Sequence, residues 1–138
     1  MRLEGLTEFQ QSLLQTSKKV DKEVPKILRK VGSKARTVVA KRARQKVKKL
    51  TGNYHKKCKR GKVFRGDSSE WVVRVINSSP HAHLIEDGHK QVNQDGQVVG
   101  FVRGKHVLKD GMAEFESSGV TEQMISDWLD DLLESNGL

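Results

Sequence analysis

The residues best suited to chemistry gather in one ten-residue stretch that ends at His89. It holds three of the five histidines of the chain, two adjacent carboxylates and a glycine. His81 and His83 are two residues apart, which on a strand would point both side chains to one face. Glu86 and His89 could complete a zinc site with an open position for hydrolysis. The spacing matches no established zinc signature, so His81, His83 and His89 are weak candidates. We expect no metal and no cofactor.

Nucleophilic catalysis has even less support in the sequence. Cys58 is the only cysteine, and His55 is the one base near it in the sequence. The two Gly-Lys pairs lack the spacing of a phosphate-binding loop. A single cysteine also excludes a disulfide framework and fits a reducing compartment. The sequence therefore predicts a protein that is not an enzyme.

A structural role explains the stretch from Pro80 to His89 better. Pro80 cannot continue the strand before it, and residues 81–87 could form about two helical turns. Gly88 would then end the helix and return the chain to a sheet. We expect Glu86 and its neighbour Asp87 to face a basic helix or a neighbouring subunit. On this interpretation the stretch is a connector, or elbow, between two parts of the fold.

The N-terminal third predicts a long basic helix. From about residue 24 to residue 50, apolar residues recur at spacings of three and four along a helix of roughly 40 Å. A shorter helical run precedes it, and because proline kinks a helix interior, we expect a break or bend near Pro25. The opposite face is basic and is a candidate interaction surface, made of Lys26, Arg29, Lys30, Lys34, Lys41, Arg44 and Lys48.

The middle of the chain predicts strands and the last third predicts helices. Residues 62–65 and 70–77 form one expected hairpin, and residues 91–92 and 97–102 flank Asp95-Gly96, a strong hairpin turn. We therefore expect an α+β fold with a small, mostly antiparallel sheet of three to four strands and C-terminal helices packed on it. The chain would be a single domain, with residues 1–50 as a basic helical arm and residues 51–138 as an α+β body.

Charge divides the chain into two halves. Residues 1–66 carry 21 Lys and Arg against 4 Asp and Glu, and residues 67–138 carry 5 against 13. Such a chain could bind a polyanion, or copies could pack head to tail with a basic half against an acidic half. The outer face of the last helix is the candidate acidic surface, with Asp127, Asp130, Asp131 and Glu134. No apolar run is long enough to cross a bilayer, so we expect a soluble protein that meets no membrane and is made in the cytoplasm.

Three motifs follow one another in an order that resembles the minor tail-component family of tailed phages. The first is Leu50-Thr51-Gly52 near the end of the basic helix. The second is His81-Ala82-His83-Leu84-Ile85-Glu86-Asp87-Gly88, in which an alanine, a glutamate and a glycine hold fixed places. The third is the helix start from Lys105 to Met112, with Leu108 at its centre. The residues that carry this resemblance are Thr51, Gly52, His81, Ala82, Glu86, Gly88 and Leu108.

This resemblance implies a structural virion protein of the head–tail connector, or neck. Its role would be tail completion or head–tail joining through assembly into a ring. The implied partners are other copies of the chain and neck or tail proteins such as the head-closure protein, the tail terminator or the tail tube. No catalytic or cofactor residue is implied. An alternative is a DNA-binding protein that uses the basic stretch 22–62 without sequence preference.

Overall fold

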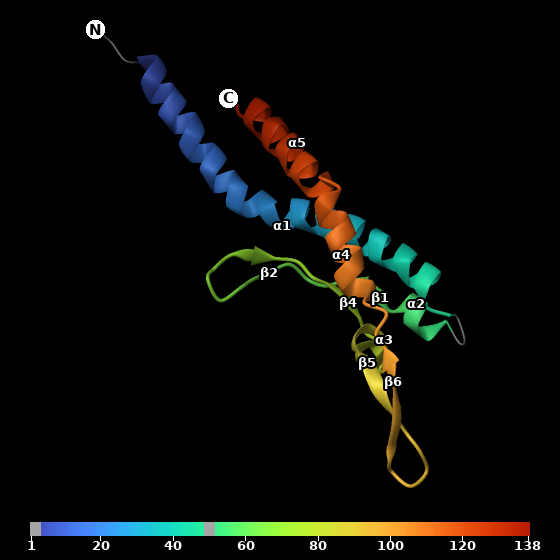
Figure 1. The fold of residues 1–138 in the computed structure, drawn as a ribbon. Helices are drawn as coiled ribbons and strands as arrows, with labels where there is room; N and C mark the ends of the chain where they lie inside the picture. Colours follow the sequence, from blue (N-terminus) through green and yellow to red (C-terminus); the bar gives the residue numbers. More distant parts are fainter. Residues whose placement is uncertain (1–3, 49–51) are drawn as a thin grey trace.

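The structure, a computed structural model, describes residues 4–48 and 52–138, with side chains from residue 8 onward. Figure 1 shows a long N-terminal helix, two C-terminal helices that pack on its middle part, and hairpins that extend away from it. The elements are α1 (Glu4–Lys46), α2 (Asn53–Lys56), β1 (Cys58–Arg60), β2 (Phe64–Arg65), β3 (Trp71–Val72), β4 (Val75–Asn77), α3 (Ala82–Asp87), β5 (Gly88–Val92), β6 (Val98–Arg103), α4 (Val107–Ser117) and α5 (Val120–Ser135).

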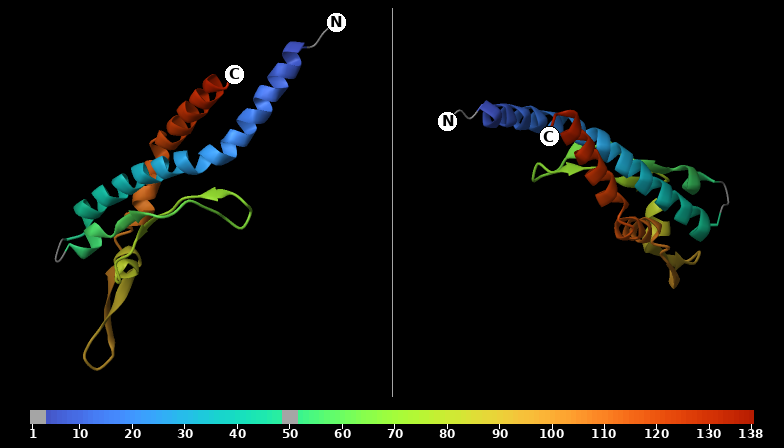
Figure 2. Two further views of the ribbon diagram at one scale, coloured as in Figure 1. Left: turned by 180° about the vertical axis from the view of Figure 1, so that it is seen from behind. Right: turned by 90° about the horizontal axis from the view of Figure 1, so that it is seen from above.

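Helix α1 runs unbroken through Pro25, and it is one helix where the sequence suggested two segments. The helix changes direction in its light-blue part, which contains this proline (Figures 1 and 2). Proline offers no backbone N–H and its ring crowds the preceding turn, so a bend is the expected result. The predicted bend is therefore confirmed. It turns the N-terminal half of α1 away from the axis of the second half.

His55 caps the C-terminal end of α1. Its Nε2 lies 2.8 Å from the carbonyl oxygen of Val47 and 3.2 Å from that of Ala43. Two carbonyl acceptors require a proton on Nε2, so this nitrogen donates to the last turn of the helix. The helix ends at Lys46, a few residues earlier than predicted. The Nε2 of His55 is thus hydrogen-bonded to the end of α1. Cys58 is only 1% exposed and is a core residue.

The strands form three separate antiparallel pairs, so the predicted sheet of three to four strands is not a single sheet. The pairs β1–β4 and β2–β3 are consecutive parts of one long hairpin. Its end pairs Phe64 with Val72, within the hairpin predicted for residues 62–65 and 70–77, whereas the pairing of β4 with β1 was not predicted. The pair β5–β6 is the second predicted hairpin, and it extends away from the rest of the molecule (Figure 1). The α+β class and the antiparallel pairing are confirmed.

The C-terminal helices lie mainly against α1 and not on a sheet. Two core clusters hold them there, and α1 contributes to both. Gly111 of α4 makes the close approach possible, because a Cβ there would lie 3.0 Å from Cγ2 of Val39. The buried residues of the first cluster are Val39, Ala40, Ala43, Tyr54, Cys58 and Val107, and those of the second are Ile27, Val31, Ala35 and Phe115.

The molecule exposes far more surface than a compact protein of its size. A compact monomer of 15.6 kDa has roughly 7,300 Å² of accessible surface. This chain has 10,184 Å². The excess comes from parts that leave the body: the N-terminal half of α1, the tip of the long hairpin and the β5–β6 hairpin (Figures 1 and 2). A protein built this way has much surface left for contact with other molecules.

Candidate assembly surfaces

The elbow begins with a short helix and ends in a tight return. Helix α3 spans Ala82–Asp87, where a helix was predicted. Gly88 follows with φ +83° and ψ 179°, a backbone conformation that is essentially restricted to glycine. A Cβ on Gly88 would collide with the carbonyl oxygen of Val102 and lie 2.7 Å from the nitrogen of Gly104. Gly88 therefore allows the two backbone segments at the base of the β5–β6 hairpin to approach each other closely.

The carboxylate of Glu86 binds the start of α4, a partner that the sequence expectation, a basic helix or a neighbouring subunit, did not include. This carboxylate accepts the backbone N–H of Leu108 at 2.9 Å and that of Lys109 at 3.0 Å. These are the first turn of α4, where backbone N–H groups lack partners within the helix and the helix dipole favours a negative charge. The carbonyls of Ile85 and Glu86 also accept the N–H groups of Lys105 and His106. Glu86 thus fastens the elbow to α4.

The three histidines of the stretch are not gathered with other ligands. His81 and His83 are exposed, and Nδ1 of His89 lies 3.1 Å from the carbonyl oxygen of Lys90. Within residues 4–48 and 52–138 there is no group of three or more His, Cys, Asp or Glu side chains that could hold a metal ion. Of the other motif residues, Thr51 lies outside the described part of the chain. Gly52 precedes α2 with φ +82°.

The residues of the predicted basic face are all exposed. Lys26 forms an ion pair with Glu23 at 3.1 Å within α1. Three of the remaining cations line an open groove of about 490 Å³ between α1 and α5, together with Met124. This groove brings positive charge beside the acidic last helix. The cations that line it are Arg29, Lys30 and Lys34.

The predicted acidic face is also exposed along α5. Asp127 accepts a hydrogen bond from Gln123 at 2.8 Å, an interaction within the helix. The end of α5 lies beside the N-terminal half of α1, because Nζ of Lys19 donates to Oδ1 of Asn136 at 2.7 Å. The acidic face therefore looks away from its own α1, and Asp130, Asp131 and Glu134 are available to another molecule.

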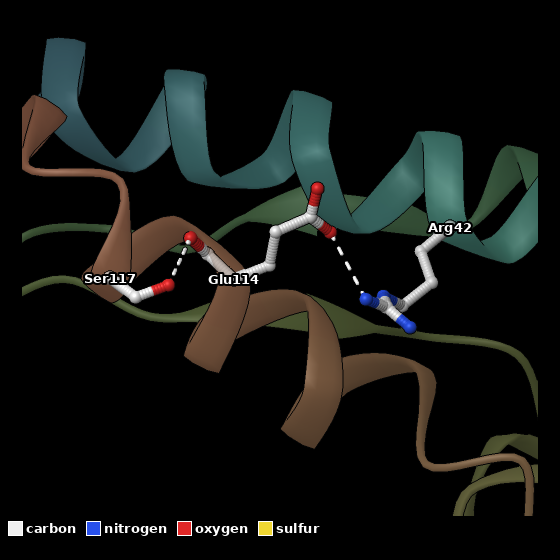
Figure 3. A network of polar contacts seen from close by, with 3 residues as sticks. All are labelled: Arg42, Glu114 and Ser117. Carbon is white, nitrogen blue, oxygen red and sulfur yellow. Dashed lines mark hydrogen bonds and ion pairs between the residues drawn. The ribbon is translucent and has the colours of Figure 1, made fainter.

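Among the residues that the structure describes, one ion pair joins the basic helix to the C-terminal helices. Arg42 Nη2 lies 3.2 Å from Oε2 of Glu114 on α4, and the hydroxyl of Ser117 donates to the Glu114 carbonyl (Figure 3). Glu114 is largely exposed, so this pair adds little stability. It shows that only a small part of the opposite charges of the two halves is used inside one copy.

Two exposed apolar surfaces were not identified from the sequence. The first, the hairpin face, consists of Val92, Val98, Val99 and Phe101, whose exposed fractions are 56%, 60%, 63% and 61%. The second, the arm stripe, consists of Phe9, Leu13 and Leu14 in the N-terminal half of α1, at 50%, 44% and 59%. The alternating pattern of the strand and the helical spacing of the arm were visible. The spacing of the arm predicts that its three apolar side chains face inward, but periodicity indicates an apolar face and does not say which molecule covers it.

A second groove, the basic groove, lies where the hairpin meets the body. It measures about 360 Å³ and lies between the end of α1, α3 and the β5–β6 hairpin. Its floor is apolar, formed by Val47, Leu84, Ile85 and Val102. Its rim carries Lys46, Lys48, Arg103 and Lys105 with His81 and His89, and no acidic residue lines it. This groove suits a partner that offers both acidic and apolar side chains.

In the part of the chain that the structure describes, no helix is long and apolar enough to cross a membrane. Comparison with known families gives a match to the model described as "Bacteriophage HK97-gp10, putative tail-component". The match covers residues 7–88, from the start of α1 to the glycine that ends the elbow. It includes the second motif in full, whereas the helix start from Lys105 to Met112 lies beyond it. No match was found among curated proteins or among solved structures. Because the matched residues make up more than half of the chain, the protein belongs to this family of phage tail components.

Proposed function

We propose that this tail component is a structural protein of the phage neck, with a role in tail completion or head–tail joining. It acts by assembling into a ring through contacts between copies and with neighbouring neck or tail proteins. The observation that carries the proposal is the surface of 10,184 Å², well above that of a compact monomer, in a member of a tail-component family. A stable interface buries about 800 Å² on each partner, so the excess of almost 3,000 Å² is sufficient for two neighbours in a ring and a further contact.

The charge distribution supports contacts between unlike surfaces. The basic face of α1 and the acidic face of α5 are exposed, and the residues in them mostly lack ion-pair partners within the described chain. Each exposed ion pair contributes only about 0–1 kcal/mol, so apolar surface must supply most of the affinity. Charge then orients neighbours and disfavours contact between like surfaces.

The neck role can be tested with a phage mutant in which the gene for this chain carries an early stop codon. We expect lysates that contain filled heads and separate tails that are unjoined in electron micrographs. Purified protein added to the lysate should restore joined particles. Joined, infectious particles made without the protein would contradict a neck role. Lysates with heads but no tails would also contradict it, because the protein would then act earlier, in tail assembly.

DNA binding is the second candidate function, and the groove lined by Arg29, Lys30 and Lys34 favours it. A phosphate backbone could follow these exposed cations without any sequence readout. Its test is binding to random duplex DNA across a salt series. Submicromolar affinity at physiological salt with a steep salt dependence would support it, and binding that vanishes at physiological salt would exclude it. The two functions are compatible, since DNA passes through a phage neck.

A further inference from the structure

We propose that the hairpin face of one copy packs on the arm stripe of the next copy in a head-to-tail contact. The inference rests on the self-assembly proposed above and names the surfaces that make the contact. The occupant of the hairpin face is thus a second copy of this chain. Four observations carry it: the one-sided apolar surface of the hairpin, the apolar strip of the arm, their separation within one copy, and the opposite charges beside the two.

The four apolar residues of the hairpin lie on one side of the ribbon. Val92 pairs with Val98, and Lys90 pairs with Phe101, so these two pairs share a side. An extra residue, Val99, interrupts the register between them and lies two positions from Phe101, which places it on the same side. The pairs of the opposite side are His89 with Val102 and Gln91 with Gly100, and the first of these pairs lines the basic groove.

A ribbon of two strands is at best marginally stable in water unless its apolar face packs on something. In this hairpin the apolar face is the one that is open to solvent, and all four of its apolar side chains are more than half exposed. Isolated exposed apolar residues are ordinary, but a contiguous apolar face on a projecting ribbon indicates a contact site.

The arm stripe has the matching form. Phe9 and Leu13 are four residues apart, and Leu14 is their neighbour, so the three side chains form one strip along the helix. A flat ribbon face can lie along such a strip. The stripe and the hairpin face are at opposite ends of the molecule in both views, so they cannot meet within one copy (Figures 1 and 2). A contact between two different surfaces is heterologous, and it closes into a ring when the rotation between copies allows it.

Charge at the two ends is also complementary. The acidic helix α5 ends beside the N-terminal half of α1, where Lys19 bonds to Asn136. Residues 110–138 contain eight Asp and Glu and neither Lys nor Arg. At the other end, the base of the hairpin carries Arg103 and Lys105 on the rim of the basic groove. Because Arg103 and Lys105 lie at the base of the same hairpin, a copy that lays its hairpin face on the arm stripe also brings positive charge toward the acidic helix of its neighbour.

The test is disulfide cross-linking in the full chain, with Leu13→Cys and Val99→Cys variants. The native Cys58 is buried and can stay. Disulfides form only when the two Cα atoms come within about 7 Å of each other, so a cross-link reports direct contact. Under mild oxidation we expect the double variant to give a ladder of dimers, trimers and larger species. A mixture of the two single variants should give dimers alone. The matched control is Gln91→Cys, on the opposite side of the same hairpin, mixed with Leu13→Cys, for which we expect no cross-link.

A second variant measures the contact without cross-linking. Val99→Lys replaces an exposed residue, so we expect its melting curve to match that of the parent while its association in sedimentation experiments is lost. Four outcomes would overturn the inference: equal cross-linking through Gln91→Cys, cross-links between identical positions, association that Val99→Lys leaves intact, or oligomers without a 13–99 cross-link. A chain that stays monomeric at every concentration would overturn it together with ring assembly. The stop-codon phage tests the neck role separately. That experiment removes the whole protein, so its result does not depend on which surfaces of two copies meet.

Discussion

Single residues decide how the elbow is built. The sequence predicted a helix that ends at Gly88, and α3 and the positive φ of that glycine are present. The partner of Glu86 could not be predicted, because its hydrogen bonds go to backbone groups 22 and 23 residues later in the chain. A carboxylate that caps a distant helix leaves no local pattern of the kind that a capping box leaves. The role of Glu86 is thus visible only in three dimensions.

Gly88→Ala should destabilise the fold more than an equivalent change at Gly96. Both glycines have positive φ, and an Ala there costs about 1 kcal/mol from the backbone alone. At Gly88 the new Cβ would also collide with the carbonyl of Val102, whereas at Gly96 no atom lies within 4 Å. We expect a loss above about 2 kcal/mol for Gly88→Ala, measured by chemical denaturation. Equal losses for the two variants would show that the close backbone approach at Gly88 does not contribute to the free energy of unfolding.

Tyr54 should make the fold sensitive to alkaline pH. Burial raises the pKa of Tyr54 to about 12, and the nearby charges of Cys58 and Glu86 add to this shift. The unfolded chain releases the phenol proton near pH 10, so the free energy of unfolding should fall as the pH rises from about 10 to about 12. The contribution is at most about 3 kcal/mol. Tyr54→Phe should show a smaller fall over the same window, measured by denaturant titrations. A variant with the same pH dependence as the parent would contradict this role.

At the scale of elements, both hairpins were predictable and their support was not. Asp95-Gly96 indicates a tight turn, and the run from Trp71 indicates a strand, so the pairs β2–β3 and β5–β6 follow from local patterns, whereas the pairing of β1 with β4 does not. Periodicity also identified the apolar stripe of α5. It could not show that this stripe packs on α1 and not on a sheet, because either partner buries the same residues.

The attachment of α4 gives a prediction at this scale. Glu86→Ala removes the carboxylate that accepts two N–H groups at the start of α4. Loss of such a cap costs about 1 kcal/mol, and up to about 2 kcal/mol where the groups are partly buried. Asp87→Ala is the matched control, since Asp87 is an exposed carboxylate one residue away. We expect thermal melts to show a lower melting temperature for Glu86→Ala and little change for Asp87→Ala. Equal effects would mean that Glu86 acts only through its charge.

The whole molecule is an open arrangement around one bent helix. Such a shape leaves much surface exposed, as a member of a family of phage tail components needs for contacts with other proteins. The contrast between a basic and an acidic half was plain in the sequence. The separation of apolar and charged surfaces at two opposite ends was not, because it depends on the bend of α1 and on the direction of the hairpin (Figure 2). This shape supports the proposed head-to-tail association through unlike ends.

The proposed association can be measured by analytical ultracentrifugation of the purified chain over a range of concentrations, at low and at high salt. We expect monomers at low concentration and reversible association as the concentration rises. Because the Debye length falls from about 10 Å at 0.1 M salt to about 3 Å at 1 M, high salt should weaken this association without abolishing its apolar part. A tight oligomer that is insensitive to salt would contradict the charge-guided contact. A monomer at every concentration and salt would contradict self-association itself.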